Sequence, residues 1–292
     1  MKPNFFIVGA PKCGTTAWVQ YLGSHPDIFF STPKEPHYFC YDFPNYRWVK
    51  NPDDYLRLFE NSGSAQAVGE ASVQYLYSEV AAKAIRDFNS NAKIIILIRD
   101  QENFLPSLHN QLVFNGDEII KDFELAWRLS SARDRTNTGW FCRELKFLDY
   151  KAAGHFSRQI ERYFECFPAE QIRVFHFHDW TLAPRDTYLE ILRFLGVEDD
   201  GRTEFVPMNV ARRRRLNWLT PLIKRPPRPL LAAFRTIKRI SGLGTGLRAK
   251  LLTVNSGGGY LTEVRDELRA EVRRYYQTEK VLVEPRIWRP GN

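Results

Sequence analysis

NFFIVGAPKCGTTAWVQYL, residues 4–22, combines three kinds of local sequence. The β-rich run Asn4–Val8 ends at Gly9, a loop follows to Thr16, and Ala17–Leu22 is compatible with a helix. Backbone N–H groups at a helix N-terminus, with glycine allowing close approach, make a binding site for a dianion. The stretch therefore predicts a strand, a phosphate-binding loop and a helix, in that order.

Strand and helix patterns alternate beyond this stretch. KIIILI (Lys93–Ile98) is apolar after its first residue, as expected of a strand buried on both faces of a parallel sheet, and IRVFHF (Ile172–Phe177) is a second strand pattern. Helical patterns cover Tyr77–Phe88, Phe156–Phe164 and Thr187–Leu195, the last ending at Gly196. The alternation predicts a three-layer α/β fold with a mainly parallel sheet, in which ligands bind beyond the carboxyl ends of the strands.

The composition is that of a folded globular protein. The chain has 292 residues, a mass of 34.2 kDa, 43% apolar and 26% charged residues, which excludes wholesale disorder. We expect one domain over residues 1–292. No uncharged apolar run approaches the ~18–20 residues of a membrane span, and the start does not resemble a signal peptide. The four cysteines form no C-x-x-C pair, which favours reduced thiols and a cytoplasmic location.

The positive charge is concentrated in one segment. The formal net charge is +8, and residues 205–262 contain twelve basic residues but no Asp or Glu. Within this segment, apolar residues from Leu230 to Leu243 recur at helical spacing, with basic residues mostly on the other side. A basic amphipathic helix within residues 212–250 suits an anionic membrane surface or a polyanionic substrate, and an ordinary surface helix is the alternative. No nucleic-acid-binding motif accompanies the charge, so we expect no nucleic-acid partner.

Two patterns in the second half of the chain have structural interpretations. Leu261–Leu282 is predicted to be a helix with Thr262 as its N-cap. His176, His178 and Asp179 follow one another at the end of a predicted strand. Packing and a cap at the entry to the next helix explain these side chains better than a metal site does, so we expect no metal.

The glycine loop departs from the motif of nucleotide kinases. That motif ends in Gly-Lys-Ser/Thr, whereas here Lys12 comes two residues before Gly14, and Thr15 and Thr16 follow. Asp100 lies shortly after a buried strand, but this pattern is too common to indicate magnesium binding. A P-loop kinase or nucleotidase is therefore the weaker of two enzyme hypotheses.

Four elements in a fixed order carry a family resemblance. They are the loop PKCGTT (residues 11–16), the pair Arg99 and Ser107 after a buried strand, HPD (25–27) with KEPHYF (34–39), and FLG (194–196) with Trp288. Together they resemble the sulfotransferases that use 3′-phosphoadenosine 5′-phosphosulfate (PAPS), in particular a bacterial soluble type similar to the glycan (heparan-type) enzymes. The resemblance covers most of the chain and is strongest over residues 5–110.

This resemblance implies a P-loop NTPase-like fold, PAPS as the co-substrate and no metal. It implies that Lys12 meets the charge that develops on the leaving nucleotide. It also implies donor contacts from the 5′-phosphosulfate loop and the 3′-phosphate pair, namely Pro11, Lys12, Cys13, Gly14, Thr15, Thr16, Arg99 and Ser107. The basic C-terminal element of the family is missing from Asn255–Tyr260, and we expect the run that begins at Arg212 to replace it.

The resemblance further implies a base and an acceptor class. Glu35 is the expected general base, matching the glutamate of glycan sulfotransferases, with His37 as the alternative or as its orienting partner. The acceptor is expected to be a hydroxyl or an amine of a carbohydrate, glycolipid or other small molecule. The basic segment favours either a lipid-linked acceptor at a membrane surface, expected at the inner face, or a polyanionic chain. A third hypothesis makes the chain a non-catalytic, nucleotide-binding adaptor for membranes or polyanions.

Overall fold

The computed structural model describes residues 1–139, 141–206, 212–214, 256–258 and 264–289, with 212–214 and 256–258 described by their backbone alone. Contacts divide the chain into two compact units. The first unit comprises Met1–Phe104, Ala153–Asn209 and Ala270–Asn292, and the second comprises Leu105–Ala152 and Val210–Arg269. Apart from residues 212–214, the amphipathic helix predicted within 212–250 lies outside the described residues.

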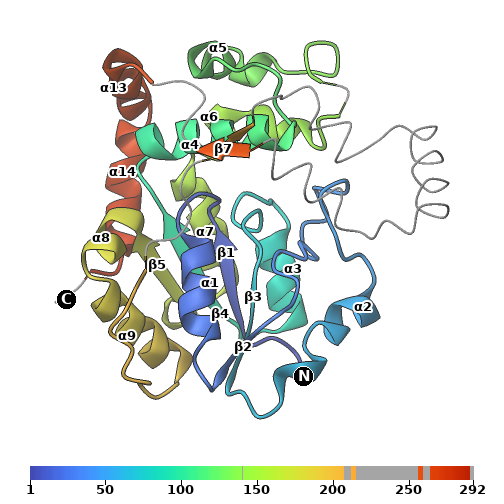
Figure 1. The fold of residues 1–292 in the computed structure, drawn as a ribbon, viewed down its shortest axis with the longest axis vertical. Helices are drawn as coiled ribbons and strands as arrows, with labels where there is room; N and C mark the ends of the chain where they lie inside the picture. The colour runs from blue at the N-terminus through green and yellow to red at the C-terminus, as the bar shows by residue number, and fades with distance from the viewer. Residues whose placement is uncertain (140, 207–211, 215–255, 259–263, 290–292) are drawn as a thin grey trace. The chain divides into compact units, whose positions relative to one another are not determined.

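A five-stranded sheet forms the centre of the first unit (Figure 1). Its order is β2-β3-β1-β4-β5, and every neighbouring pair is parallel. The strands are β1 (Phe5–Gly9), β2 (Ile28–Phe30), β3 (Ala67–Ala71), β4 (Lys93–Ile98) and β5 (Ile172–His176). All of β1 and β3 is buried, as is β4 after its first residue, which makes these three strands the core of the unit.

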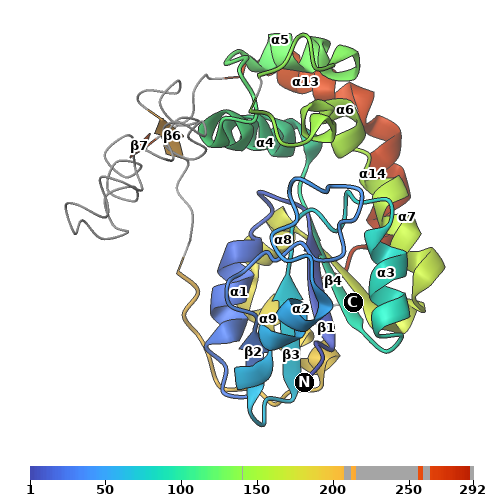
Figure 2. The same cartoon turned by 90° about the vertical axis from the view of Figure 1, so that its right-hand side faces the viewer.

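Helices cover both faces of this sheet. α1 (Thr15–Gly23) and α9 (Pro184–Leu195) lie on one face, and α3 (Ala81–Phe88) and α7 (Phe156–Cys166) lie on the other (Figure 2). Shorter helices complete the unit, namely α2 (Pro52–Arg57), α8 (Phe177–Leu182) and α14 (Gln277–Val283). The predicted three-layer α/β class and its P-loop-like succession of strand, loop and helix are confirmed.

Three of the five strands match the sequence prediction to within one residue. The other two, β2 and β3, carry no recognisable strand pattern. β2 has only three residues, and β3 has the sequence AVGEA, in which Gly69 and Glu70 interrupt the apolar run. Gly69 is required there because a Cβ would lie 2.1 Å from the ring of Phe5 on the neighbouring strand. Tertiary packing therefore selects a strand that β-propensity disfavours.

The prediction of one continuous helix over Leu261–Leu282 is wrong. α13 (Asp266–Tyr275) and α14 are separated at Tyr276, whose backbone leaves the helical region at φ −102° and ψ 19°. The buried Tyr276 ring packs on Gly154, where a Cβ would lie 2.5 Å from it, and meets the ring of His155 edge-on at 5.3 Å. This packing accounts for the break, and Thr262 lies outside the described residues.

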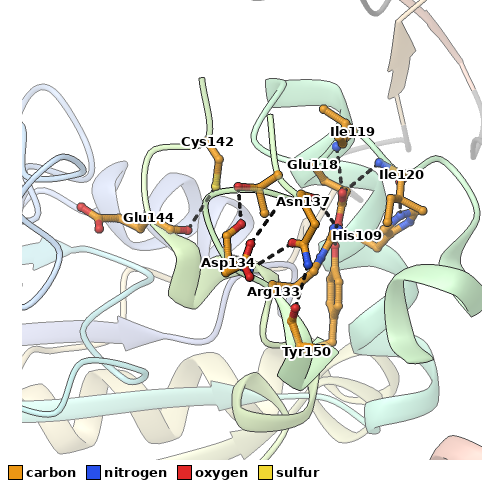
Figure 3. A network of polar contacts seen from close by, with 12 residues as sticks. His109, Glu118, Ile119, Ile120, Arg133, Asp134, Asn137, Cys142, Glu144 and Tyr150 are labelled. Carbon is orange, nitrogen blue, oxygen red and sulfur yellow. Dashed lines mark hydrogen bonds and ion pairs between the residues drawn. The ribbon is translucent and has the colours of Figure 1, made fainter. Parts of the chain in front are cut away.

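Buried polar contacts organise the second unit (Figure 3). α4 (Gln101–Asn115) begins in the first unit and continues into the second, which also holds α5 (Phe123–Arg128) and most of α6 (Tyr150–Ala153). The Glu118 carboxylate accepts the N–H groups of Ile119 and Ile120 at 2.8 Å each and the Tyr150 hydroxyl at 3.1 Å. It also forms a buried ion pair with Arg133.

The same network includes a histidine. Nε2 of His109 lies 2.9 Å from the carbonyl oxygen of Ile120, and burial lowers the pKa of this imidazole. A neutral ring that donates its N–H to that carbonyl fits both observations.

The backbone of Arg212–Arg214 (β6) pairs antiparallel with that of Ser256–Gly258 (β7). The first three arginines of the four-arginine run are thus paired with the start of the glycine-rich stretch.

Two further predictions concern the chain as a whole. Among the described residues, no helix is both long enough and apolar enough to cross a membrane. All four cysteines are free thiols, and three of them, Cys13, Cys40 and Cys142, are buried.

Candidate active site

The carboxyl edge of the parallel sheet gathers four segments that carry polar side chains. The glycine loop follows β1, the Lys34–His37 segment follows β2, Ser72 follows β3, and Arg99 follows β4. Parallel strands end on the same edge, so residues far apart in the sequence meet there. The structure brings Lys12, Lys34, Glu35, His37 and Arg99 to this edge, as the electrostatic contacts below demonstrate.

The glycine loop is held in one conformation by its neighbours. Gly14 precedes α1 in the left-handed region, with φ +90°, and a Cβ there would lie 2.2 Å from the ring of Trp180. Only glycine fits this position. The loop thereby presents the N-terminus of the nine-residue helix α1, where unpaired N–H groups favour an anion. The sequence predicted this arrangement.

The remaining loop residues differ in exposure. Cys13 is fully buried, and burial raises the pKa of its thiol to about 12, so the thiol stays protonated and unreactive at neutral pH. Thr15 is buried and Thr16 is exposed at the start of α1. Lys34 donates from Nζ to the Thr15 hydroxyl at 3.4 Å, which links the segment after β2 to the phosphate loop.

Two cations meet beside the loop. Burial lowers the pKa of Lys12, the positive charge of Arg99 lowers it further, and the negative charge of Glu35 raises it. The Arg99 guanidinium stacks on the ring of Phe177 at 4.5 Å and forms no ion pair with any described residue. Two neighbouring cations without a matching carboxylate for Arg99 favour the binding of an anion.

Glu35 lies between a lysine and a histidine. Its Oε1 accepts from Lys34 Nζ at 2.6 Å, and its Oε2 lies 3.5 Å from His37 Nε2. Burial alone raises the pKa of Glu35, but the hydrogen bond from His37 and the positive charge of Lys34 outweigh it and lower that pKa to about 2. The carboxylate is therefore ionised at neutral pH. The buried His37 ring packs on Tyr46, with centroids 4.6 Å apart.

Backbone conformation singles out the same residues. Among the described residues, the non-glycine positions with positive φ are Lys12 (63°), Glu35 (65°) and His37 (51°). Such conformations cost about 1–3 kcal/mol each and persist only where the surroundings enforce them, often at functional sites. These are the three residues that the resemblance proposes for catalysis. No sequence pattern indicates this strain.

Two predicted donor contacts belong to the second unit. Ser107 lies on the part of α4 that belongs to the second unit, and it is buried there. The backbone of Arg212 lies in β6, also in the second unit, and its side chain lies outside the described part of the chain. Their contacts with a donor remain predictions.

A cavity of about 200 Å³ borders Arg99 at the ends of β4 and β5. Its basic lining consists of Arg99, His176, His178, Lys280 and Arg289, and its acidic lining of Asp100, Asp179, Glu279 and Glu284. His176 accepts the N–H of His178 at 3.3 Å and so caps α8, as predicted. Among the described residues, no three His, Cys, Asp or Glu side chains form a group suited to a metal ion.

Hydroxyl groups that support the backbone at and after His37 are not predicted from the sequence. Ser72 Oγ accepts the backbone N–H of His37 at 3.0 Å, and the Tyr75 hydroxyl accepts that of Phe39 at 3.2 Å. Both hydroxyls donate to the buried carboxyl of Glu70. The one signal in the sequence is a charged residue between apolar ones in AVGEASV (residues 67–73), which is uninformative without the fold.

Two comparisons with known proteins point to the same family. A family model described as "Sulfotransferase domain" matches residues 2–209. A crystal structure of a sulfotransferase from Alicyclobacillus acidocaldarius is 31% identical, covers 72% of this chain and 87% of its own, and superposes with a TM-score of 0.64.

Curated relatives are more distant or longer. The bifunctional heparan sulfate N-deacetylase/N-sulfotransferase 3 of Mus musculus is 26% identical over 200 residues, which are 67% of this chain and 22% of that protein. The membrane-associated sulfotransferase kil1 of Dictyostelium discoideum is 34% identical and covers 74% of this chain and 60% of its own length. The chain thus spans about a fifth of the first of these relatives. With the family model covering most of its length and a similar solved structure matching the same fold, the chain belongs to the sulfotransferase family.

Proposed function

We propose that this protein transfers a sulfuryl group from PAPS to a hydroxyl or amine of a carbohydrate-type acceptor. The observation that carries the proposal is the convergence at one sheet edge of an anion-binding loop, the two cations Lys12 and Arg99, and the carboxylate Glu35. Family membership supports the reaction class. The pairing of Glu35 with His37 supports a role in accepting a proton.

The residues present fit an anionic donor. Gly14 and the start of α1 offer backbone N–H groups, and Arg99 has no acidic partner among the described residues. Each of these features suits a phosphate or phosphosulfate group. PAPS, when bound, supplies the sulfuryl group. Pro11, Cys13, Thr15 and Thr16 would surround its 5′ end, and Arg99, Ser107 and Arg212 its 3′-phosphate.

Lys12 and Glu35 divide the chemistry. Lys12 places its ammonium where negative charge grows on the leaving nucleotide. Glu35 accepts the proton of the acceptor hydroxyl or amine, and His37 orients its Oε2. Lys34 already reaches Thr15 of the loop, so an anion bound there attracts its ammonium away from Oε1. Loss of that charge raises the pKa of Glu35, because burial then opposes ionisation with one partner fewer. Donor binding thereby makes Glu35 a stronger base.

Relatives support the acceptor class and a membrane location. The names of several curated relatives specify heparan sulfate as the acceptor of their N-sulfotransferase activity, and that of another specifies membrane association. We extend from these a carbohydrate acceptor, either lipid-linked or free, and contact of residues 212–250 with an anionic membrane at the cytoplasmic face. The excess of basic residues in that segment supports the contact.

The first test is calorimetric titration of adenosine 3′,5′-bisphosphate into the wild-type protein and into Arg99→Ala. We expect tight binding that weakens by about 10–100-fold in the variant, the range for one hydrogen-bonded charge. Arg57→Ala, at an exposed helix position, is the matched control and should bind like the wild type. ATP should bind much more weakly. Absence of binding, or preference for magnesium-ATP, would refute the proposal.

A transfer assay with radiolabelled PAPS then defines the acceptor. N-desulfated heparan, unsulfated glycosaminoglycans and a glycolipid are offered in parallel. Label incorporated into a glycan, and lost in Lys12→Ala, supports the proposed reaction. Binding of the bisphosphate without transfer to any of these acceptors would restrict the proposal to the donor site.

A further inference from the structure

Glu70 is the one carboxyl group enclosed in the core of the described part of the first unit's sheet. It lies in β3, and its exposed fraction is 0%. Three hydroxyl groups donate to it. Ser72 Oγ donates to Oε1 at 2.5 Å, and the hydroxyls of Tyr55 and Tyr75 donate to Oε2 at 2.5 and 3.1 Å. Among the described residues, no cationic side chain bonds to it.

Two of the three hydroxyls have a second partner in the Lys34–Phe39 segment. Ser72 Oγ accepts the N–H of His37 at 3.0 Å, and the Tyr75 hydroxyl accepts the N–H of Phe39 at 3.2 Å. A hydroxyl has one proton to donate. Each hydroxyl gives that proton to ionised Glu70 and so turns its lone pairs toward the segment. The carboxylate thereby fixes the direction in which both hydroxyls accept.

The point of attachment is where the backbone is strained. His37 and Glu35, two residues apart, both have positive φ. A β-carbon in this region is unfavourable unless nearby bonds hold the chain. The His37 N–H bond to Ser72 lies within this strained stretch, and the Phe39 bond to Tyr75 anchors the residues that follow it.

We propose that Glu70 is a positioning residue that, through Ser72 and Tyr75, holds the backbone of the Glu35–His37 segment in its reactive conformation. This inference rests on the proposed function, since it assigns Glu35 and His37 to the reaction. Glu70 itself touches neither donor nor acceptor. Its effect is on geometry at Glu35, where a displacement of about 1 Å lowers a rate by up to about 100-fold.

Tyr55 provides the matched control. Tyr55 and Tyr75 donate to the same oxygen of Glu70, and both are fully buried. Only the Tyr75 hydroxyl also accepts a backbone N–H of the segment. Tyr55→Phe and Tyr75→Phe therefore each remove one hydroxyl from the Glu70 cluster, but only the second removes a link to the segment.

The experiment measures kcat, the KM for PAPS and bisphosphate affinity in Ser72→Ala, Tyr75→Phe and Tyr55→Phe. We expect kcat to fall about 10–100-fold in Ser72→Ala and about 3–10-fold in Tyr75→Phe, while Tyr55→Phe stays within about twofold of the wild type. Bisphosphate affinity should be unchanged in all three, because the glycine loop and Arg99 are untouched. Ser72→Thr retains the hydroxyl and should recover most of the rate.

The outcomes separate the two proposals. Equal losses of kcat in Tyr55→Phe and Tyr75→Phe would overturn the positioning role, because the cluster would then act through stability alone. If Ser72→Ala does not fold, the two tyrosine variants still decide. A wild-type protein that binds no bisphosphate and transfers no label would instead refute the proposed function.

Discussion

Two buried glutamates, one in each unit, are satisfied in different ways. Glu118 in the second unit is paired with the guanidinium of Arg133 and accepts two backbone N–H groups from the residues directly after it. Glu70 in the first unit has three hydroxyl donors and no cation among its described partners. Both carboxyls have an exposed fraction near zero. A buried carboxyl group is thus accommodated in two ways in one chain, by a cation with backbone N–H groups or by hydroxyl groups alone.

The difference shows what each solution suits. A guanidinium neutralises the charge outright and fixes a loop, as around Glu118 (Figure 3). Hydroxyls satisfy the oxygens without neutralising them, and burial then raises the pKa of Glu70 to about 7. The hydroxyls also have lone pairs left over, so the cluster reaches outward to a neighbouring segment. The ion pair of Glu118 stabilises the fold. The hydroxyl cluster of Glu70 also fixes the position of the neighbouring Lys34–Phe39 segment.

The largest effect should come from breaking the buried ion pair. We expect Arg133→Met to lower the free energy of unfolding by about 3–5 kcal/mol, because it leaves Glu118 buried without its cation. Urea denaturation measures this. Lys83→Met, which breaks an exposed pair with Asp87, is the control and should be indistinguishable from the wild type. Comparable losses of stability in the two variants would mean that the buried ion pair of Glu118 contributes no more than an exposed one.

The second prediction concerns the exposed edge of the first unit. Glu35→Gln removes a carboxylate that is partly exposed and belongs to a strained segment. We expect kcat to fall about 10²–10⁴-fold, the range for a general base, with bisphosphate affinity retained. The unfolding free energy should fall only slightly, since the ion pair with Lys34 that the amide loses is partly exposed. Retained activity in a folded Glu35→Gln protein would transfer the base role to His37.

The third prediction tests the titration of Glu70. Its folded pKa of about 7 lies above the ordinary value of 4.5, so between these values the folded protein holds a proton that the unfolded chain releases. Stability from this group is therefore present below about pH 4.5 and is lost as pH rises through 7, by about 3 kcal/mol at most.

Denaturation of the wild type and of Glu70→Gln at pH 5 and pH 8 measures this loss. The wild type should become less stable at the higher pH relative to the variant, whose amide does not titrate. The hydroxyls that face Glu70 remain protonated over this range, because burial raises the pKa values of Tyr55 and Tyr75 well above 10. A constant difference between the two proteins at both pH values would contradict a titrating Glu70.

The smallest effect is expected at Lys34. Lys34→Met removes the positive charge 2.6 Å from Glu35 and should raise the pKa of Glu35 from about 2 toward its ordinary value. Carbon-detected NMR titration of the glutamate carboxyls measures this. Stability should change little, because the pair is partly exposed. If the pKa of Glu35 does not change in this variant, His37 alone would account for its low value.

The sequence predicts those parts of the molecule that depend on local pattern. β4 is a continuous apolar run after its first residue. Gly9 and Gly14, next to a strand pattern, indicate the glycine loop. β3 is not predicted because Gly69 is required by the packing of the Phe5 ring from another strand, and because the burial of Glu70 depends on hydroxyl groups that the fold gathers around it. The break at Tyr276 likewise depends on Gly154, more than a hundred residues earlier.

The candidate site divides in the same way. Lys12, Glu35 and Arg99 are identifiable because each stands in a recognisable motif. The pairing of Glu35 with Lys34 and His37, the positive φ angles and the layer formed by Ser72 and Tyr75 are not, because they depend on which strands are neighbours in the sheet. Adjacent placement of β2, β3 and β1 is what brings these groups together.

The close approach of Trp180 to Gly14 gives the loop an optical reporter. The indole is largely buried, lies where a Cβ of Gly14 would be, and meets the ring of Trp18 edge-on at 5.6 Å. An anion settling on the N–H groups of the loop changes the electric field across both rings and hence their fluorescence. Subtracting the emission of Trp180→Phe from that of the unmodified protein isolates this signal from the other tryptophans. Donor binding can thus be followed in real time with no added dye.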